Sequence, residues 1–89
     1  MKAVVTVVGK DRVGIIAAVC VKLAEFNVNV LDISQTVMQG YFTMMMVVDV
    51  SNISLPLAQL CQQMDAKGQE MGLSIRVQRE DIFNAMHRV

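Results

Sequence analysis

The charged turn between Gly9 and Gly14 carries the most specific chemistry in the sequence. Lys10, Asp11 and Arg12 stand there, between an apolar run typical of a strand and one typical of a helix. A strand-to-helix turn leaves the first amide groups of the helix without partners, and these amides attract a carboxylate. The turn therefore predicts either a site for a small carboxylate-bearing molecule or ordinary capping, with Asp11 capping the helix and Gly14 packing on the sheet.

Phosphate binding at this turn is not predicted. The spacing of Gly9 and Gly14 matches the outer glycines of a P-loop, but Ile15 and Ile16 stand where that motif requires a lysine and a hydroxyl. The sequence also has no GxGxxG motif. If the turn binds a ligand, the expected partner is a carboxylate rather than a nucleotide.

The remaining reactive residue types are too scattered to form a catalytic or metal site. Met44–Met46 lie in a strand-like segment, where neighbouring side chains point to opposite faces and cannot converge on one ion. Cys20 and Cys61 each fall on an apolar helical stripe, as small core residues do. The single histidine, His87, has no nucleophile or base that the sequence places beside it. We expect no enzyme activity, no metal and no cofactor.

Composition narrows the class of protein. The 89 residues predict one domain, and eight basic residues balance eight acidic ones without a basic cluster. Nucleic-acid binding is therefore not expected, and RNA recognition would also need more strand aromatics than Tyr41 and Phe42. No run is long enough to span a membrane, no signal peptide is evident, and two cysteines form no disulfide framework, so a cytoplasmic setting is expected.

The apolar content points to self-association. Hydrophobic residues make up 54% of the chain, which is more than a small sphere buries unaided. We therefore expect a second buried surface, most simply the interface of a homo-oligomer, with a dimer as the expected form.

Periodicity predicts four strands and three helices. The second helix is expected to have Ser54 as its N-cap, Pro56 in its first turn and Gly72 at its end. A left-handed residue, Asn27, is expected to end the first helix. The predicted strands span residues 2–8, 28–39, 41–50 and 73–78, and the predicted helices span 13–26, about 54–71 and 81–89.

This order predicts an α+β, ferredoxin-like βαββαβ sandwich. Two βαβ halves joined by a hairpin at Gln39-Gly40 give a four-stranded antiparallel sheet with both long helices on one face. On the third strand alternate residues are then expected to face outward, on a surface that needs a cover: Tyr41, Thr43, Met45, Val47 and Asp49. We expect residues 1–80 to form this domain and residues 81–89 a helical extension, with its stripe Ile82, Phe83, Met86 and Val89 at least half buried.

Three segments resemble the ACT domain, a ferredoxin-like regulatory module that binds amino acids or other small metabolites. They are the turn GKDRVGI, the segment NVNVLDISQ at the start of the second strand, and the third strand GYFTMMMVVDV. The length and the tail EDIFNAMHRV are similar to small stand-alone ACT proteins related to the regulatory domain of the glycine cleavage repressor.

The resemblance implies where a ligand binds. In this family the ligand lies between the first turn of one protomer and the start of the second strand of another. Carried over, the implied ligand-binding residues are Asp11, Arg12, Val13 and Gly14 on the turn and Asn29 on the strand. Many members have proline where Val13 stands, and often asparagine where Asp11 stands. An aspartate prefers the ammonium of a ligand to its carboxylate.

The sequence therefore predicts a non-enzymatic sensor of a small molecule, with an amino acid as the expected ligand. It would act through a ligand-linked change in its own oligomer or in a regulated protein partner. The alternative is a structural or protein-interaction module that binds no ligand.

Overall fold

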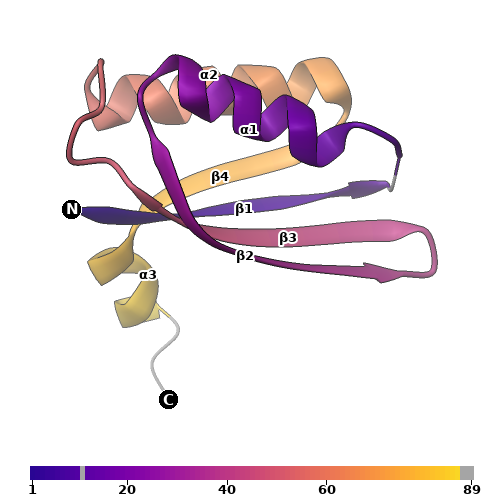
Figure 1. Cartoon of the computed structure of the whole chain (residues 1–89). Helices are drawn as coiled ribbons and strands as arrows, with labels where there is room; N and C mark the ends of the chain where they lie inside the picture. Colours follow the sequence, from indigo (N-terminus) through magenta and orange to yellow (C-terminus); the bar gives the residue numbers. More distant parts are fainter. Residues whose placement is uncertain (11, 87–89) are drawn as a thin grey trace.

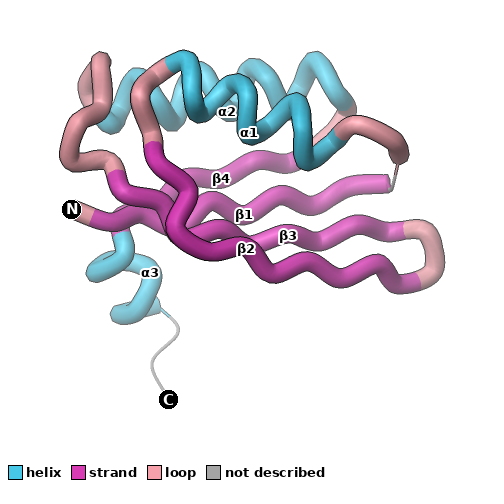
Figure 2. The backbone as a smooth tube through the Cα atoms, in the orientation of Figure 1, coloured by secondary structure: helices cyan, strands magenta, loops and turns pink. Residues whose placement is uncertain are grey.

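The computed structural model describes residues 1–10 and 12–86, and its element order confirms the α+β, ferredoxin-like prediction (Figure 1). The four strands form one antiparallel sheet, with α1 and α2 on one face and α3 beneath the other (Figure 2). In chain order the elements are β1 (Lys2–Lys10), α1 (Ile15–Glu25), β2 (Asn29–Met38), β3 (Tyr41–Asp49), α2 (Leu57–Met71), β4 (Ser74–Arg79) and α3 (Glu80–Met86).

The sheet has the strand order β2-β3-β1-β4, so β2 and β4 are its edges. The hairpin between β2 and β3 turns at Gln39 and Gly40, whose φ angles are 52° and 82°. Two positive φ angles in a two-residue loop match the twist of the flanking strands. The short turn therefore fixes the antiparallel register, in which Met38 pairs with Tyr41 and Asn29 with Asp49.

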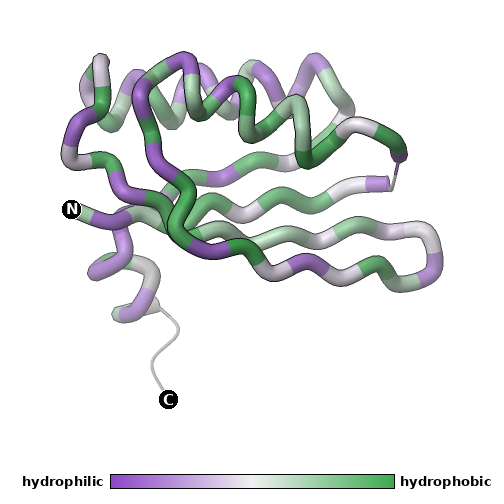
Figure 3. Tube along the Cα trace, viewed as in Figure 1, coloured by the Kyte–Doolittle hydropathy of each residue, from purple (hydrophilic) through white to green (hydrophobic). Residues whose placement is uncertain are grey.

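The core lies between the sheet and the two long helices. On β3 the predicted alternation is confirmed, because Phe42, Met44 and Met46 are buried while Tyr41 and Met45 are exposed. The methionines therefore fill the core or face outward rather than converge. Figure 3 shows hydrophobic residues recurring along α1 and the strands beneath it, whereas α2 is more hydrophilic and faces solvent on one side.

The starts of both long helices differ from the prediction. Helix α1 begins at Ile15, so Gly14 stands just before the helix instead of inside it. Helix α2 begins at Leu57 behind Pro56, which has φ −59° and ψ 146° and no side-chain capping bond. Ser54 is therefore not the N-cap; its N–H donates to the Phe26 carbonyl. Proline imposes an extended conformation on the residue before it, which delays the helix start.

The helix ends agree with the prediction. Asn27 adopts φ 62° just after α1, and Gly72 adopts φ 70° at the end of α2. The Gly72 N–H reaches back to the carbonyls of Gln69 and Gly68. These left-handed residues satisfy the last carbonyls of each helix and return the chain to the sheet.

Helix α2 rests on β4 through a glycine. A Cβ atom at Gly68 would lie 2.7 Å from the Leu73 carbonyl oxygen, so any larger residue would push the helix away. The Leu73 N–H donates to the Gly68 carbonyl at 2.7 Å. The Leu73 side chain in turn lies against Gly9 of β1. Close packing of backbone on backbone therefore fixes the position of α2.

Helix α3 covers part of the outer sheet face, where it packs against β1 and β4. Val4 and Val8 both point to this face from β1, but Val4 is only 5% exposed whereas Val8 is 42% exposed. Ile82 on α3 is 46% exposed, so just over half of it is covered, as predicted. The other residues of the predicted stripe lie outside what the structure describes: the side chains of Phe83 and Met86, and Val89.

Because α3 covers Val4 and not Val8, the two valines should respond differently to truncation. We expect Val4→Ala to lower the free energy of unfolding by about 1–2 kcal/mol and Val8→Ala by less than about 0.5 kcal/mol. In a chain ending at Arg79 the two substitutions should cost the same. Urea denaturation of the four variants checks this, and an equal cost in the full chain would show that α3 does not protect Val4.

Candidate functional site

A cleft of about 340 Å³ opens between the start of α1 and the edge strand β2. It lies at the end of the sheet that carries the β2–β3 hairpin, because β1 ends there opposite Tyr41. One wall is the first turn of α1, the other is β2, and the buried ring of Phe42 lies between them. The lining residues are Arg12, Gly14, Ile15, Ile16, Ala17, Gln35, Val37 and Phe42.

The α1 wall presents amide groups without helical partners. Gly14 occupies the N-cap position, and its carbonyl accepts the first helical bond, from the Ala18 N–H at 2.9 Å. The amides of Ile15, Ile16 and Ala17 come before that bond, and no side chain of the described residues caps them. Free amides and the positive end of a helix dipole favour an anion, so this wall suits a carboxylate.

Gly14 is required by its backbone conformation. Its φ is 92°, in the left-handed region that side chains rarely adopt. A Cβ atom at this position would have no neighbour within 4 Å, so Gly14 does not pack on the sheet. The packing part of the capping interpretation is therefore wrong. Asp11, which that interpretation used as the cap, lies outside the described residues.

Arg12 is tied to the other long helix. Its Nη2 donates to the Met71 carbonyl oxygen at 2.6 Å, and Met71 is the last residue of α2. A guanidinium at this place satisfies a carbonyl that the helix leaves unpaired and lies at the negative end of its dipole. Since Arg12 also lines the cleft, it contacts both the site and α2.

The β2 wall contributes Gln35 and Val37, which the sequence analysis did not single out. Gln35 pairs with the buried Met44, so it lies on the helix side of the sheet, but the edge position of β2 leaves it exposed. The sequence could have indicated Gln35, because it is a polar residue at a strand position whose side chain faces the helices. Its side-chain amide can both donate and accept a hydrogen bond at the cleft.

The predicted site residues separate into two groups. Arg12 and Gly14 line the cleft, and Val13 between them is fully exposed. Asn29 lies at the opposite end of β2, paired with Asp49. Asn29 and Val37 are eight residue steps apart along β2, which at about 3.3 Å a step is roughly 25 Å. A single chain therefore does not bring Asn29 to the turn.

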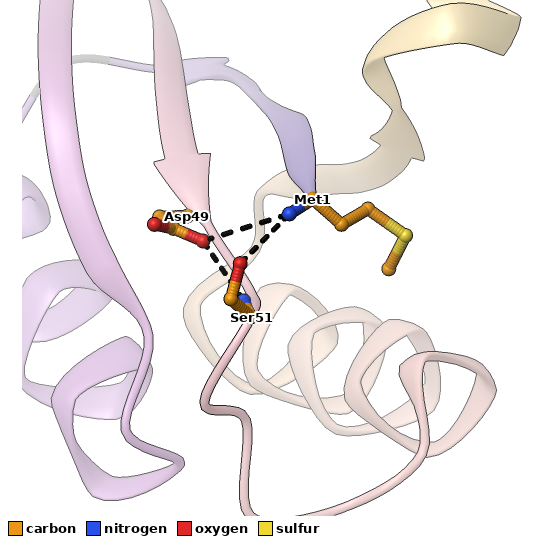
Figure 4. Close-up of polar contacts among 3 residues, drawn as sticks. All are labelled: Met1, Asp49 and Ser51. Carbon is orange, nitrogen blue, oxygen red and sulfur yellow. Dashed lines mark hydrogen bonds and ion pairs between the residues drawn. The ribbon is translucent and has the colours of Figure 1, made fainter.

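A small polar network lies at the end of the sheet where Asn29 pairs with Asp49, and Figure 4 shows its three residues. The Met1 ammonium donates to Ser51 Oγ at 2.7 Å and lies 3.9 Å from Asp49 Oδ1, which also accepts the Ser51 N–H at 2.8 Å. The pKa of Asp49 is lowered, first by the Ser51 hydroxyl and then by the Ser51 N–H. This network joins the start of β1 to the end of β3, so we assign it a structural role.

A second cleft, of about 260 Å³, lies on the other side of the sheet beside α3. Its apolar lining comes from the strands, including Val4, Met45 and Val47. Its polar lining is Asp32, Ser34, Glu80 and Asn84, and no basic residue of the described chain lines it. The sheet separates this cleft from the first one.

Other reactive groups form no site in the parts of the chain that the structure places. Cys20 and Cys61 are free thiols and partly buried. Burial raises the pKa of Cys61, whose Sγ lies 3.4 Å from the Val77 carbonyl oxygen. Within residues 1–10 and 12–86 no three His, Cys, Asp or Glu side chains gather to hold a metal. None of the described helices is both long enough and apolar enough to cross a bilayer.

Comparison with known proteins identifies the family. A model of the ACT domain matches residues 2–78, which includes the turn, both long helices and nearly all of the sheet. The chain belongs to the ACT domain family. A UPF0237 protein of Listeria innocua is 53% identical over 89 residues, and the match covers all of both chains.

Solved structures agree with this assignment. An ACT domain protein from Streptococcus pneumoniae is 47% identical, covers 98% of each chain and superposes with a TM-score of 0.83. A putative glycine cleavage system transcriptional repressor has a TM-score of 0.73 at 24% identity, over 86% of this chain and 44% of its own. The similarity to the putative repressor shows a shared fold. The helix α3 begins after the last residue that the ACT model matches.

The left-handed conformation of Gly14 predicts which substitutions this position tolerates. Gly14→Ala should lower the free energy of unfolding by about 1–2 kcal/mol, because a Cβ atom is strained at this φ even though the space is open. Gly14→Asn should cost less, since asparagine tolerates this region. Chemical denaturation measures both, and an equal or larger loss for asparagine would contradict the backbone explanation.

Proposed function

We propose that this ACT domain is a non-enzymatic cytoplasmic sensor that binds an amino acid in the cleft between α1 and β2. The observation that supports it best is the open N-terminus of α1, where Ile15, Ile16 and Ala17, whose amides have no side-chain cap among the described residues, line a cleft together with Arg12. A ligand carboxylate would accept hydrogen bonds from these amides. The membership of the chain in a family of regulatory modules supports the same function.

The ammonium of the ligand needs an acceptor. In this proposal Asp11 and the side-chain oxygen of Asn29 from a facing protomer receive it, while Val13 and Gly14 contribute backbone. Gln35 is an acceptor that the same chain supplies, because it already lines the cleft. The roughly 25 Å between Asn29 and the turn within one chain means that Asn29 can act only across an oligomer interface.

Self-association is the second part of the proposal. The outer sheet face keeps apolar side chains in solvent, among them Val8, Tyr41 and Met45. Exposed apolar side chains on one sheet face support an interaction site there. We propose a homodimer that changes on ligand binding and acts on itself or on a regulated protein partner.

Ligand binding predicts a large thermal shift. A ligand at 100 times its dissociation constant stabilises the folded state by about 2.7 kcal/mol, and each kcal/mol moves the midpoint of a small domain by roughly 4–8 °C. We therefore expect at least one amino acid at millimolar concentration to raise the midpoint by about 10 °C or more. Differential scanning fluorimetry over the common amino acids measures this.

A variant of the α1 wall separates binding from folding. Ala17→Glu places a carboxylate beside the free amides, so it should leave the ligand-free midpoint unchanged or higher and abolish the ligand shift. Ala58→Glu makes the same change in the first turn of α2, away from the cleft, and should keep the shift. If no amino acid shifts the wild-type midpoint, the alternative of an interaction module without a ligand is favoured. A shift that survives Ala17→Glu would place the site elsewhere.

The proposed dimer predicts twice the mass of one chain at high micromolar concentration. Met45→Lys puts a charge in the centre of the outer sheet face and should lower the mass toward that of a monomer. Gln62→Lys adds the same charge on the solvent side of α2 and should leave the mass unchanged. Multi-angle light scattering measures all three proteins, and a monomeric wild type would refute this part of the proposal.

A further inference from the structure

Arg12 connects the cleft to the end of α2. It is the only charged residue among the described residues that line the cleft, and its Nη2 donates to the Met71 carbonyl at 2.6 Å. Met71 ends α2, so the guanidinium lies at the negative end of that helix dipole. One residue therefore lines the cleft and, through its side chain, bonds to the end of a second helix.

Among the described residues, the groups around the cleft carry positive charge and no negative charge. The positive N-terminus of α1 borders the cleft, Arg12 is one of its lining residues, and no carboxylate of the described residues lines it. On its far side Arg12 already meets a negatively polarised carbonyl. A carboxylate in the cleft would give alternating signs from α1 through the ligand and Arg12 to α2, which lowers the electrostatic energy of all four groups.

We propose that a ligand carboxylate shares the Arg12 guanidinium with the Met71 carbonyl, so that binding at α1 tightens the last turn of α2. This rests on the proposed function, since it assumes that the cleft takes a carboxylate. A guanidinium has five N–H donors in a planar fork, so it can serve both oxygens at once. The bond to Met71 holds the side chain in place, which reduces the cost of ordering it when the ligand arrives.

The contacts that continue from Arg12 and Met71 lead to β4. Behind Met71 the chain reverses at the left-handed Gly72, and the Leu73 N–H bonds to the Gly68 carbonyl at 2.7 Å. A tighter last turn therefore acts directly on the entrance to β4, an edge strand of the sheet. Ligand binding therefore changes the structure of the turn between α2 and β4, on the side of the molecule away from β2.

Nuclear magnetic resonance with two small probes tests this. Acetate carries only the carboxylate of an amino acid, and methylammonium only the cation. Titrated at equal concentrations and constant ionic strength, acetate should shift the amides of Ile15–Ala17 and, with the same midpoint, the Gly72 nitrogen, which shares a peptide group with the Met71 carbonyl. Methylammonium should shift neither.

The variant Arg12→Gln isolates the shared donor. It should weaken acetate binding at Ile15–Ala17 by about tenfold, the loss of one charge-assisted hydrogen bond, and remove the response at Gly72. Arg12→Lys keeps the charge without the fork and should retain a weakened response at Ile15–Ala17. Arg76→Gln is the matched control, because it neutralises an exposed arginine on the outer sheet face and should behave as wild type.

Three results would overturn the inference. If acetate moves Ile15–Ala17 and leaves Gly72 unchanged in the wild type, Arg12 does not couple the site to α2, although the proposed function stands. An equal Gly72 response in Arg12→Gln, or in Arg12→Lys where the glutamine variant does not fold, would show coupling by another route. No response to acetate at any amide would overturn both this inference and the carboxylate site on which it rests.

Discussion

The close approach of α2 to β4 at Gly68 is the contact on which the rest of the arrangement depends. With no side chain at that position the helix backbone sits directly over Leu73. This close approach fixes the position of the C-terminal end of α2 over the sheet. It therefore also fixes the position of the Met71 carbonyl that Arg12 contacts. The turn that begins α1 is thus positioned from two directions, by β1 below it and by α2 beside it. The geometry of the cleft beside that turn is therefore set by backbone packing rather than by the side chains that line the cleft.

The two faces of the sheet differ in chemistry because helices cover them unequally. Both long helices cover one face, and their packing buries alternate residues of β1, β3 and β4. Strand β2 lies at the edge, where helix cover is thin, so its inward residues Gln35 and Val37 stay accessible and form a wall of the cleft. The opposite face receives only α3, which shields Val4 and leaves Val8 in solvent. One-sided cover therefore produces both an accessible cleft and an exposed sheet.

Much of the fold could be predicted from the sequence because its signals are local. Alternation along β3, the Gln39-Gly40 turn and the left-handed Asn27 and Gly72 each depend on a few neighbouring residues. The helix starts were less predictable, since Pro56 displaces the expected Ser54 cap and Gly14 takes the cap position itself. Of the residues that the sequence implied for a ligand site, Arg12 and Gly14 line the cleft, and their role in binding stays a prediction. Neither the role of Gln35 nor the bond from Arg12 to Met71 could be predicted, because both join segments that are distant in sequence.

The strand order also has a consequence for how the chain reaches this state. Among the described strands β1 comes first in the chain and β4 comes last, yet in the sheet β1 lies between β3 and β4. Pairing of this kind closes large loops before it gains contacts, which slows folding relative to helical proteins of the same size. Until β4 arrives, β1 keeps an unpaired edge of valines, and α2 has no strand on which Gly68 can rest. A nascent or nicked chain that lacks β4 would expose a β-prone segment with an unpaired edge, so pairing with β4 protects this protein from aggregation.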